Sequence, residues 1–146
     1  MAQGVSAVDK HGQQSNSGRQ VLRSTAIPAP RFFYSPCVRI GSIVQVAGMV
    51  GLDPDSGQLV AGGPGAEMTR IFGNLRRALP DYRVSLDDLL IARIFTTRFD
   101  DFAEINSAWD AALTGADIPP ARTAVGVSAL PLGASVEVEF TFVVTT

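Results

Sequence analysis

The sequence is poor in the side chains that support most metal and nucleophilic chemistry. Among its 146 residues there is one cysteine, Cys37, and one histidine, His11. A single cysteine cannot form an internal disulfide or a thiolate metal cluster. With only one histidine, a His/Cys zinc site and a Ser-His or Cys-His nucleophile are not expected either. Any chemistry should therefore use carboxylates, arginines, hydroxyls, backbone groups and water.

Positive charge and long apolar runs are also scarce. The chain has 12 Lys and Arg against 14 Asp and Glu, a net charge of −2, and Lys10 is its only lysine. This balance does not suggest a nucleic-acid surface. The apolar runs are short, so neither a transmembrane helix nor a secretory signal is expected. We expect a cytoplasmic protein, and a transit peptide stays an alternative because the first residues contain few acidic ones.

Apolar residues, by contrast, are plentiful in total. They make up 46% of the chain and charged residues 18%, which is on the apolar side of normal for a globular domain. The excess suggests that a partner hides some of the surface. Residues 1–22 are rich in Gly, Ser and Gln and should form a flexible N-terminal extension. Residues 23–146 are long enough for one domain with a hydrophobic core.

Hydrophobic periodicity predicts seven elements, in the order strand, strand, helix, strand, helix, strand, strand. Such an order is typical of an α+β domain whose mixed or antiparallel sheet carries two helices on one face. Pro80 should end the first helix. The segments are a hairpin over Cys37–Gly48, a helix from Pro64, a strand over Leu89–Thr97, a helix from Phe102, and two strands joined by a Pro-Leu-Gly turn within Pro119–Phe142.

Two of the expected strands are apolar on both of their sides. They are Ile43–Ala47 and Leu89–Phe95, and only Arg93 interrupts the second. Two helices can cover one face of such a sheet, so something else should cover the other. A second copy of the chain is the simplest candidate.

The last strand alternates apolar and polar residues. Glu137 and Glu139 fall between Val136, Val138 and Phe140, so both carboxylates should point away from the helices. If the apolar sides of the last two strands pair, Arg122 shares that open face with Glu137. A cross-strand ion pair is the structural alternative. Small residues on the Arg122 side, and the rigid Pro119-Pro120 before it, favour a ligand site.

Six segments, in this order, resemble the RidA/YjgF family of small imine and enamine deaminases. They lie between Ile27 and Val143, and the "PAR" and "ALPLGASVEVE" portions of the last are the most specific. The segments are "YSPCVRIG", "VAGMVGLDPDSGQLVAGG", "NLRRAL", "SLDD", "DFAEIN" and "PPARTAVGVSALPLGASVEVE".

This resemblance implies a chorismate-mutase-like subunit and a homotrimer with clefts between its subunits. It also implies hydrolysis of 2-imino acids and enamines to 2-keto acids and ammonia, without a cofactor or a metal. Arg122 matches the arginine that grips the substrate carboxylate, for which its planar fork is suited. Glu137 matches the carboxylate that activates water.

Four further residues match substrate-binding positions of the family. Tyr34 matches a cleft aromatic and Gly48 a backbone contact, whereas Asn106 borders the site and Ala124 stands where some members have cysteine. Each has a structural alternative. Tyr34 could be an interface aromatic, Gly48 could ease a turn, and Asn106 could face solvent or bond a loop.

The chain departs from the family pattern where the cleft is expected. "FFY" replaces the common "GPY" before Tyr34, and "AGM" at Ala47-Gly48-Met49 replaces "SGQ". A more apolar cleft would favour larger or branched imino acids, or a non-catalytic trimer that binds small carboxylates or partner proteins. Chorismate mutase activity has less support, because Arg122 is the only cation that the pattern places at the site. Ribonuclease activity has little support from a chain of net charge −2 with no histidine in the expected fold. Arg39, Arg93 or Arg98 could enter the cleft of a neighbouring subunit.

Overall fold

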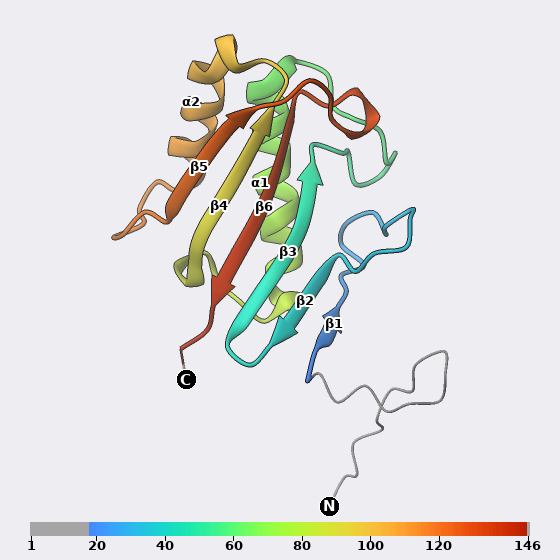
Figure 1. The fold of residues 1–146 in the computed structure, drawn as a ribbon, viewed down its shortest axis with the longest axis vertical. Coiled ribbons are helices and arrows are strands. Elements are labelled where there is room, and N and C mark those ends of the chain that lie inside the picture. The colour runs from blue at the N-terminus through green and yellow to red at the C-terminus, as the bar shows by residue number, and fades with distance from the viewer. Residues whose placement is uncertain (1–17, 146) are drawn as a thin grey trace, which may run out of the picture.

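Six strands form one mixed sheet in the computed structural model, which describes residues 18–145 (Figure 1). Their spatial order is β1-β2-β3-β6-β4-β5, and every neighbouring pair is antiparallel except the parallel pair β4 and β5. The α+β architecture predicted from the sequence is therefore confirmed. The strands are β1 Gln20–Leu22, β2 Cys37–Ile40, β3 Ile43–Val50, β4 Leu89–Thr96, β5 Ala121–Gly126 and β6 Val136–Val143.

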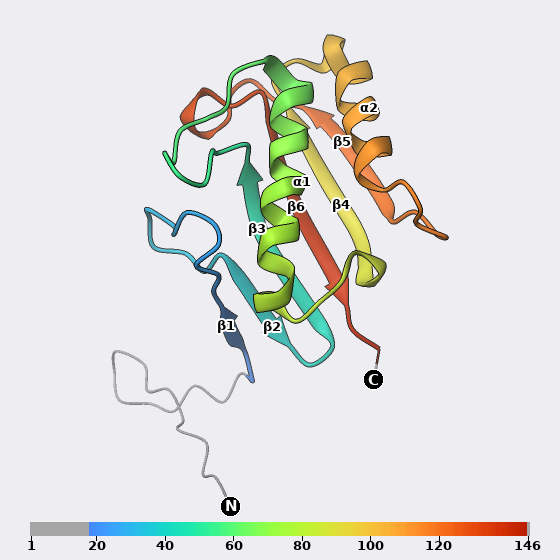
Figure 2. The same cartoon turned by 180° about the vertical axis from the view of Figure 1, so that it is seen from behind.

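Both helices lie on one face of this sheet (Figures 1 and 2). α1 spans Gly63–Tyr82 and α2 spans Phe102–Ala112. Pro64 stands in the first turn of α1, where a proline costs no backbone hydrogen bond. One apolar stripe of α1 is buried against the sheet, and Phe72 meets Trp109 of α2 and Phe140 of β6 edge to face. Members of the stripe are Met68, Ile71, Phe72, Leu75, Ala78 and Leu79.

The expectation that Pro80 ends the first helix is wrong. α1 continues through Pro80 to Tyr82, whose side chain is fully buried. A proline this close to the end of a helix removes only one backbone hydrogen bond, and burial of the Tyr82 ring offsets that loss. The helix ends at Arg83, which takes a left-handed conformation with φ 56°.

The last two strands do not form the expected hairpin. β4 lies between them, with Ala92 opposite Arg122 of β5 on one side and opposite Phe140 of β6 on the other. Residues 127–135 make this arrangement possible, since they cross the end of β4 before β6 begins. The backbone N–H of Val127 donates to the Thr96 carbonyl (2.9 Å) at that crossing.

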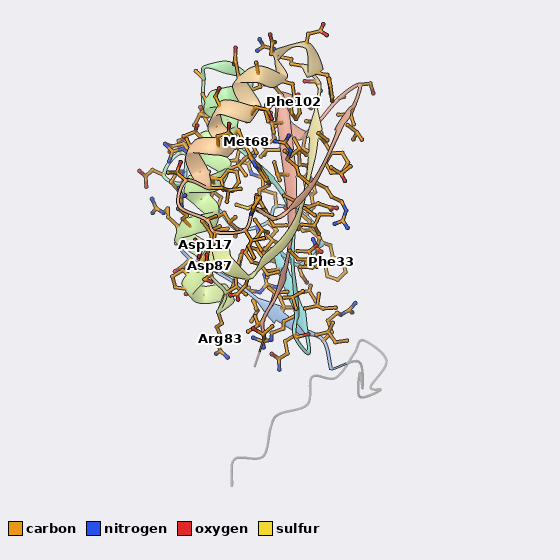
Figure 3. The ribbon with its side chains drawn as sticks, turned by 90° about the vertical axis from the view of Figure 1, so that its left-hand side faces the viewer. Phe33, Met68, Arg83, Asp87, Phe102 and Asp117 are labelled. Atoms are coloured by element: carbon orange, nitrogen blue, oxygen red, sulfur yellow. The ribbon has the colours of Figure 1, made fainter. Side chains whose placement is uncertain are left out.

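The sheet face opposite the helices is open in a single chain, as the sequence predicted. Ile43 of β3 is 46% exposed and Val125 of β5 is 41% exposed on this face. Phe33, in the loop before β2, lies on the same side of the molecule, away from the helices (Figure 3). Within the described part of the chain, neither helix is long and apolar enough to cross a membrane.

The N-terminal part predicted as an extension is described only from residue 18 onward. There β1 pairs antiparallel with β2, with Val21 opposite Val38. Residues 1–17 lie outside the described part of the chain.

Candidate functional site

Glu137 points to the open face of the sheet. It stands in β6 between Val136 and Val138, which are fully buried beneath the helices, and it is only partly exposed itself. Because side chains alternate along a strand, its carboxylate lies on the other face. The orientation predicted for Glu137 is thus confirmed.

Gly48 makes room for this carboxylate. The pairing of β3 with β6 is irregular between Val46 and Met49, so the strand bulges at this point. A Cβ atom on residue 48 would lie 2.0 Å from Oε1 of Glu137, which is far inside contact distance. Any other residue here would displace the Glu137 carboxylate, so Gly48 lets that carboxylate keep its position beside β3.

The surroundings of Glu137 favour its protonated form. Burial, followed by the negative charge of nearby Glu139, raises the pKa of the Glu137 carboxyl above its ordinary value. A carboxylate with a raised pKa is a stronger base once ionised, so it is better suited to take a proton from water.

Tyr34 lies near the end of β3 that contains Gly48. It precedes Pro36, whose carbonyl accepts a hydrogen bond from the N–H of Ala47 (3.0 Å), and Ala47 is the neighbour of Gly48. The Tyr34 ring is about half exposed. We call Glu137, Gly48 and Tyr34 the Glu137 cluster.

Arg122 lies on the helix side of β5. Its Nη1 donates to Oδ1 of Asn106 (2.9 Å), and its guanidinium stands 5.1 Å from the ring centre of Trp109 and 5.5 Å from that of Phe102. All three partners belong to α2. These contacts orient the guanidinium and leave most of its donors available for an anion.

Ala124 follows Arg122 on the same side of β5 and packs against the core. Its small side chain leaves the space beside the arginine open. We call Arg122, Asn106 and Ala124 the Arg122 cluster. Asn106 thus bonds the arginine, rather than facing solvent as one alternative supposed.

The prediction that Arg122 and Glu137 share one face within the same subunit is wrong. Glu137 is opposite Phe95 on β4, whereas Arg122 is opposite Ala92, whose side chain is fully buried on the helix side. Since β5 is an edge strand, its larger residues Thr123 and Val125 need not face the core. The alternation of apolar and polar residues in β5 therefore does not show which side of the strand faces the helices. The alternative of a cross-strand ion pair is also wrong, because β4 separates the two strands.

The three arginines considered for a neighbouring cleft all have partners in their own chain. Arg93 pairs with Glu139 (3.4 Å) on the open face, and Arg98 pairs with Asp101 (2.7 Å). Arg39 donates to the carbonyl of Gly41 (3.0 Å). Glu139 therefore takes part in an ion pair beside Glu137.

Sequence reasoning missed one buried polar contact near Glu137. The Glu67 side chain, on α1, is almost fully buried and accepts hydrogen bonds from the N–H (2.8 Å) and the hydroxyl of Ser135. Ser135 precedes Glu137 by two residues, so this contact fixes the start of β6. Glu67 stands four residues before Ile71 on the buried stripe, which could have indicated its burial.

No three side chains of the types that bind metal ions gather anywhere within residues 18–145. The two clusters, with one arginine, one carboxylate and neighbouring polar groups, could bind a small carboxylate and activate a water molecule.

Comparison with known proteins supports the resemblance seen in the sequence. The family model described as endoribonuclease L-PSP matches residues 24–144. The 2-iminobutanoate/2-iminopropanoate deaminase of Mus musculus is 34% identical over 121 residues, which cover 83% of this chain and 88% of that protein. Protein DfrA of Myxococcus xanthus is 33% identical over 123 residues, which cover 83% of this chain and 92% of that protein.

A solved structure agrees with this relationship. RidA from the Antarctic bacterium Psychrobacter sp. PAMC 21119 superposes with a TM-score of 0.80 at 32% identity. The match covers 86% of this chain and 99% of that one. Sequence and fold together therefore show that this chain belongs to the RidA/YjgF family.

Proposed function

We propose that this protein hydrolyses reactive 2-imino acids and their enamine tautomers to 2-keto acids and ammonia. In this proposal it acts as a homotrimer whose clefts lie between subunits, and it needs no cofactor. The single observation that carries the proposal is that the chain presents both an oriented, accessible Arg122 and a Glu137 carboxylate of raised pKa. Two mammalian relatives are named 2-iminobutanoate/2-iminopropanoate deaminases, which supports the same reaction.

In the proposed mechanism Arg122 binds the α-carboxylate of the substrate through two parallel hydrogen bonds. Glu137 takes a proton from a water molecule as the water oxygen attacks the iminium carbon. The resulting carbinolamine receives that proton on its nitrogen. The C–N bond then breaks as the hydroxyl loses its proton and becomes the keto group, and the departing ammonia carries the proton away as ammonium.

A site that uses both residues requires two copies of the chain. Arg122 and Glu137 lie on opposite faces of one sheet, on strands that β4 separates. Strands are about 4.8 Å apart, so one small substrate could not reach both groups through the sheet. We therefore propose that the Arg122 cluster of one subunit faces the Glu137 cluster of its neighbour.

A competition assay tests the reaction itself. An amino-acid oxidase generates the 2-imino acid in situ, and semicarbazide competes for it with the added protein. We expect the wild type to suppress semicarbazone formation and Arg122→Ala to be about a hundredfold less active, because the carboxylate loses its charged partner. A wild-type protein that is folded and trimeric but inactive on every precursor would contradict the proposal.

Mixing two inactive variants tests the shared site. When Arg122→Ala and Glu137→Ala subunits are refolded together, about one quarter of the inter-subunit sites regain both groups, as follows from random assembly of a cyclic oligomer. We expect activity to return to that extent. If the mixture stays as inactive as its components, Arg122 and Glu137 do not act across an interface.

A non-catalytic member that binds small carboxylates or partner proteins is the second candidate. Ala47 and Met49, which flank Gly48, are apolar and offer no group to hold a water molecule. Replacing both by the family's polar residues, as Ala47→Ser with Met49→Gln, separates the candidates. A binder would gain activity only in this variant, whereas an enzyme is already active without it.

A further inference from the structure

A hollow of about 510 Å³ lies next to the Glu137 cluster, and the mechanism above does not use it. It is lined by Arg19, Arg23, Pro30, Phe32, Phe33, Tyr34, Ser35 and Val38. Its volume falls within the range of small-molecule sites. Val38 follows the fully buried Cys37 in β2, so the hollow opens on the face away from the helices. Figure 3 shows Phe33 on that side of the molecule.

The lining of this hollow has the chemistry of an anion site. It contains two guanidinium groups and three aromatic rings but no carboxylate. Arg23 is exposed and makes no hydrogen bond, ion pair or ring contact with any residue from 18 to 145. A guanidinium in this state can offer its planar fork to a ligand carboxylate without first breaking a contact.

Tyr34 connects the hollow to the proposed reaction, because it belongs both to this lining and to the Glu137 cluster. If Arg122 of the neighbouring subunit holds the α-carboxylate and Glu137 faces the imine carbon, the substrate side chain extends away from Arg122. The hollow beside Tyr34 opens on the same face of the sheet as the Glu137 carboxylate, so we expect the side chain to enter it. Arg23 would then stand at the far end of the substrate.

We propose that the hollow receives the side chain of the substrate, and that Arg23 selects 2-imino acids whose side chain ends in a second carboxylate. This inference rests on the proposed function. Arg23 would thus be a specificity-determining residue, and the exposed Phe32 and Phe33 rings would line the aliphatic part of such a side chain. Phe32 and Phe33 are 81% and 99% exposed.

Binding of stable keto acids tests this selection without catalysis. The probes are 2-oxoglutarate and 2-oxopentanoate, which have the same chain length and differ in the second carboxylate. Titration calorimetry should show that the wild type binds 2-oxoglutarate about twofold to fivefold more tightly, as expected for a partly solvated ion pair. Arg23→Ala should bring the ratio of the two affinities to about one, and Arg23→Lys should give an intermediate ratio.

Arg77→Ala is the matched control. Arg77 is an exposed arginine of α1, on the helix side, so its removal makes the same change in net charge away from the hollow. We expect this variant to keep the wild-type ratio. The inference is wrong if the wild type shows no preference for 2-oxoglutarate, if Arg23→Ala keeps the preference, or if Arg77→Ala abolishes it equally.

The competition assay separates failure of this inference from failure of the proposed function. It is run with the imines that oxidases generate from glutamate and from norvaline. Equal hydrolysis of both imines would leave the proposed function standing and overturn the selection by Arg23. Hydrolysis of neither, together with a calorimetric preference that Arg23→Ala removes, would overturn the proposed function and retain the hollow as a carboxylate site.

Discussion

Glu137 shows how a single residue can couple activity and stability to pH. Its pKa is raised in the folded protein, so the folded state holds a proton that the unfolded state releases at lower pH. The stability that protonated Glu137 contributes is complete below the unfolded-state pKa and is lost as the pH rises through the folded-state pKa. Above that window, the ionised carboxylate destabilises the fold.

We therefore expect Glu137→Gln to be more thermostable than the wild type at pH 8 and to lose this advantage at pH 4. Glutamine keeps the shape of the side chain without its charge, and the same change should abolish the proposed hydrolysis. Melting temperatures measured across this pH range check the prediction. Asp110→Gln, on the exposed side of α2, is the control and should show no such trend. A constant difference between Glu137→Gln and the wild type at all pH values would contradict it.

Tyr82 contributes a second effect at the residue scale. Its ring is fully buried, its hydroxyl has no hydrogen-bond partner within the described chain, and burial raises the pKa of that hydroxyl to about 12. We expect Tyr82→Phe to raise the free energy of unfolding by about 1 kcal/mol, because it removes an unsatisfied buried group. Urea denaturation measures this, with Tyr34→Phe as the exposed-hydroxyl control. A loss of stability in Tyr82→Phe would show that the hydroxyl is satisfied in solution.

At the scale of elements, the end of α1 stores strain in an unusual residue. Arg83 has φ 56° and ψ 43°, and its N–H donates to the carbonyl of Pro80 (3.2 Å). Glycine usually occupies this position because a Cβ atom is disfavoured there. We expect Arg83→Gly to stabilise the protein by about 0.5–1 kcal/mol. Thermal or urea denaturation would show it.

Arg83→Ala is the informative comparison for that helix end. It removes the same charge and length of side chain but keeps the Cβ atom, so it should not stabilise the protein. If both variants gain stability equally, the side chain of Arg83 and not its backbone conformation is responsible.

The sequence predicted elements more reliably than their pairing. Alternation along β6 placed Glu137 on the open face correctly, because Val136, Val138 and Phe140 face a fully formed core. The same reasoning failed for Arg122, because β5 is an edge strand and its apolar residue Val125 faces away from the core. Pairing of β5 with β4 depends on the path of residues 127–135, which local periodicity does not encode.

The candidate site followed a similar pattern. Family motifs identified Arg122, Asn106, Glu137 and Gly48, and the structure brings them together as two pairs. No sequence pattern indicated that the pairs would lie on opposite faces. Nor did one reveal the buried bond of Glu67 to Ser135, because it joins residues far apart in the chain.

At the scale of the whole molecule, the open sheet face should be an interface between copies. Ile43 and Val125 are exposed there although each belongs to a strand, and a second copy would bury them. We expect Ile43→Lys to convert the proposed trimer to a monomer with its far-UV circular dichroism unchanged. Sedimentation velocity measures the shift.

Thr69→Lys is the control for this substitution. Thr69 is exposed on α1, on the opposite side of the sheet, so a lysine there should leave the proposed trimer intact. If both variants remain trimeric, the copies associate through another surface.

The stacking of Arg122 on Trp109 also gives this protein a natural optical signal. Trp109 is the only tryptophan of the chain, and the guanidinium stands 5.1 Å from its ring centre. A cation at that distance produces an electric field at the indole ring, and the emission of an indole responds to such a field. When an anion neutralises the arginine, the intrinsic fluorescence of the unlabelled protein should change, so ultraviolet emission alone can follow occupancy of the arginine in real time.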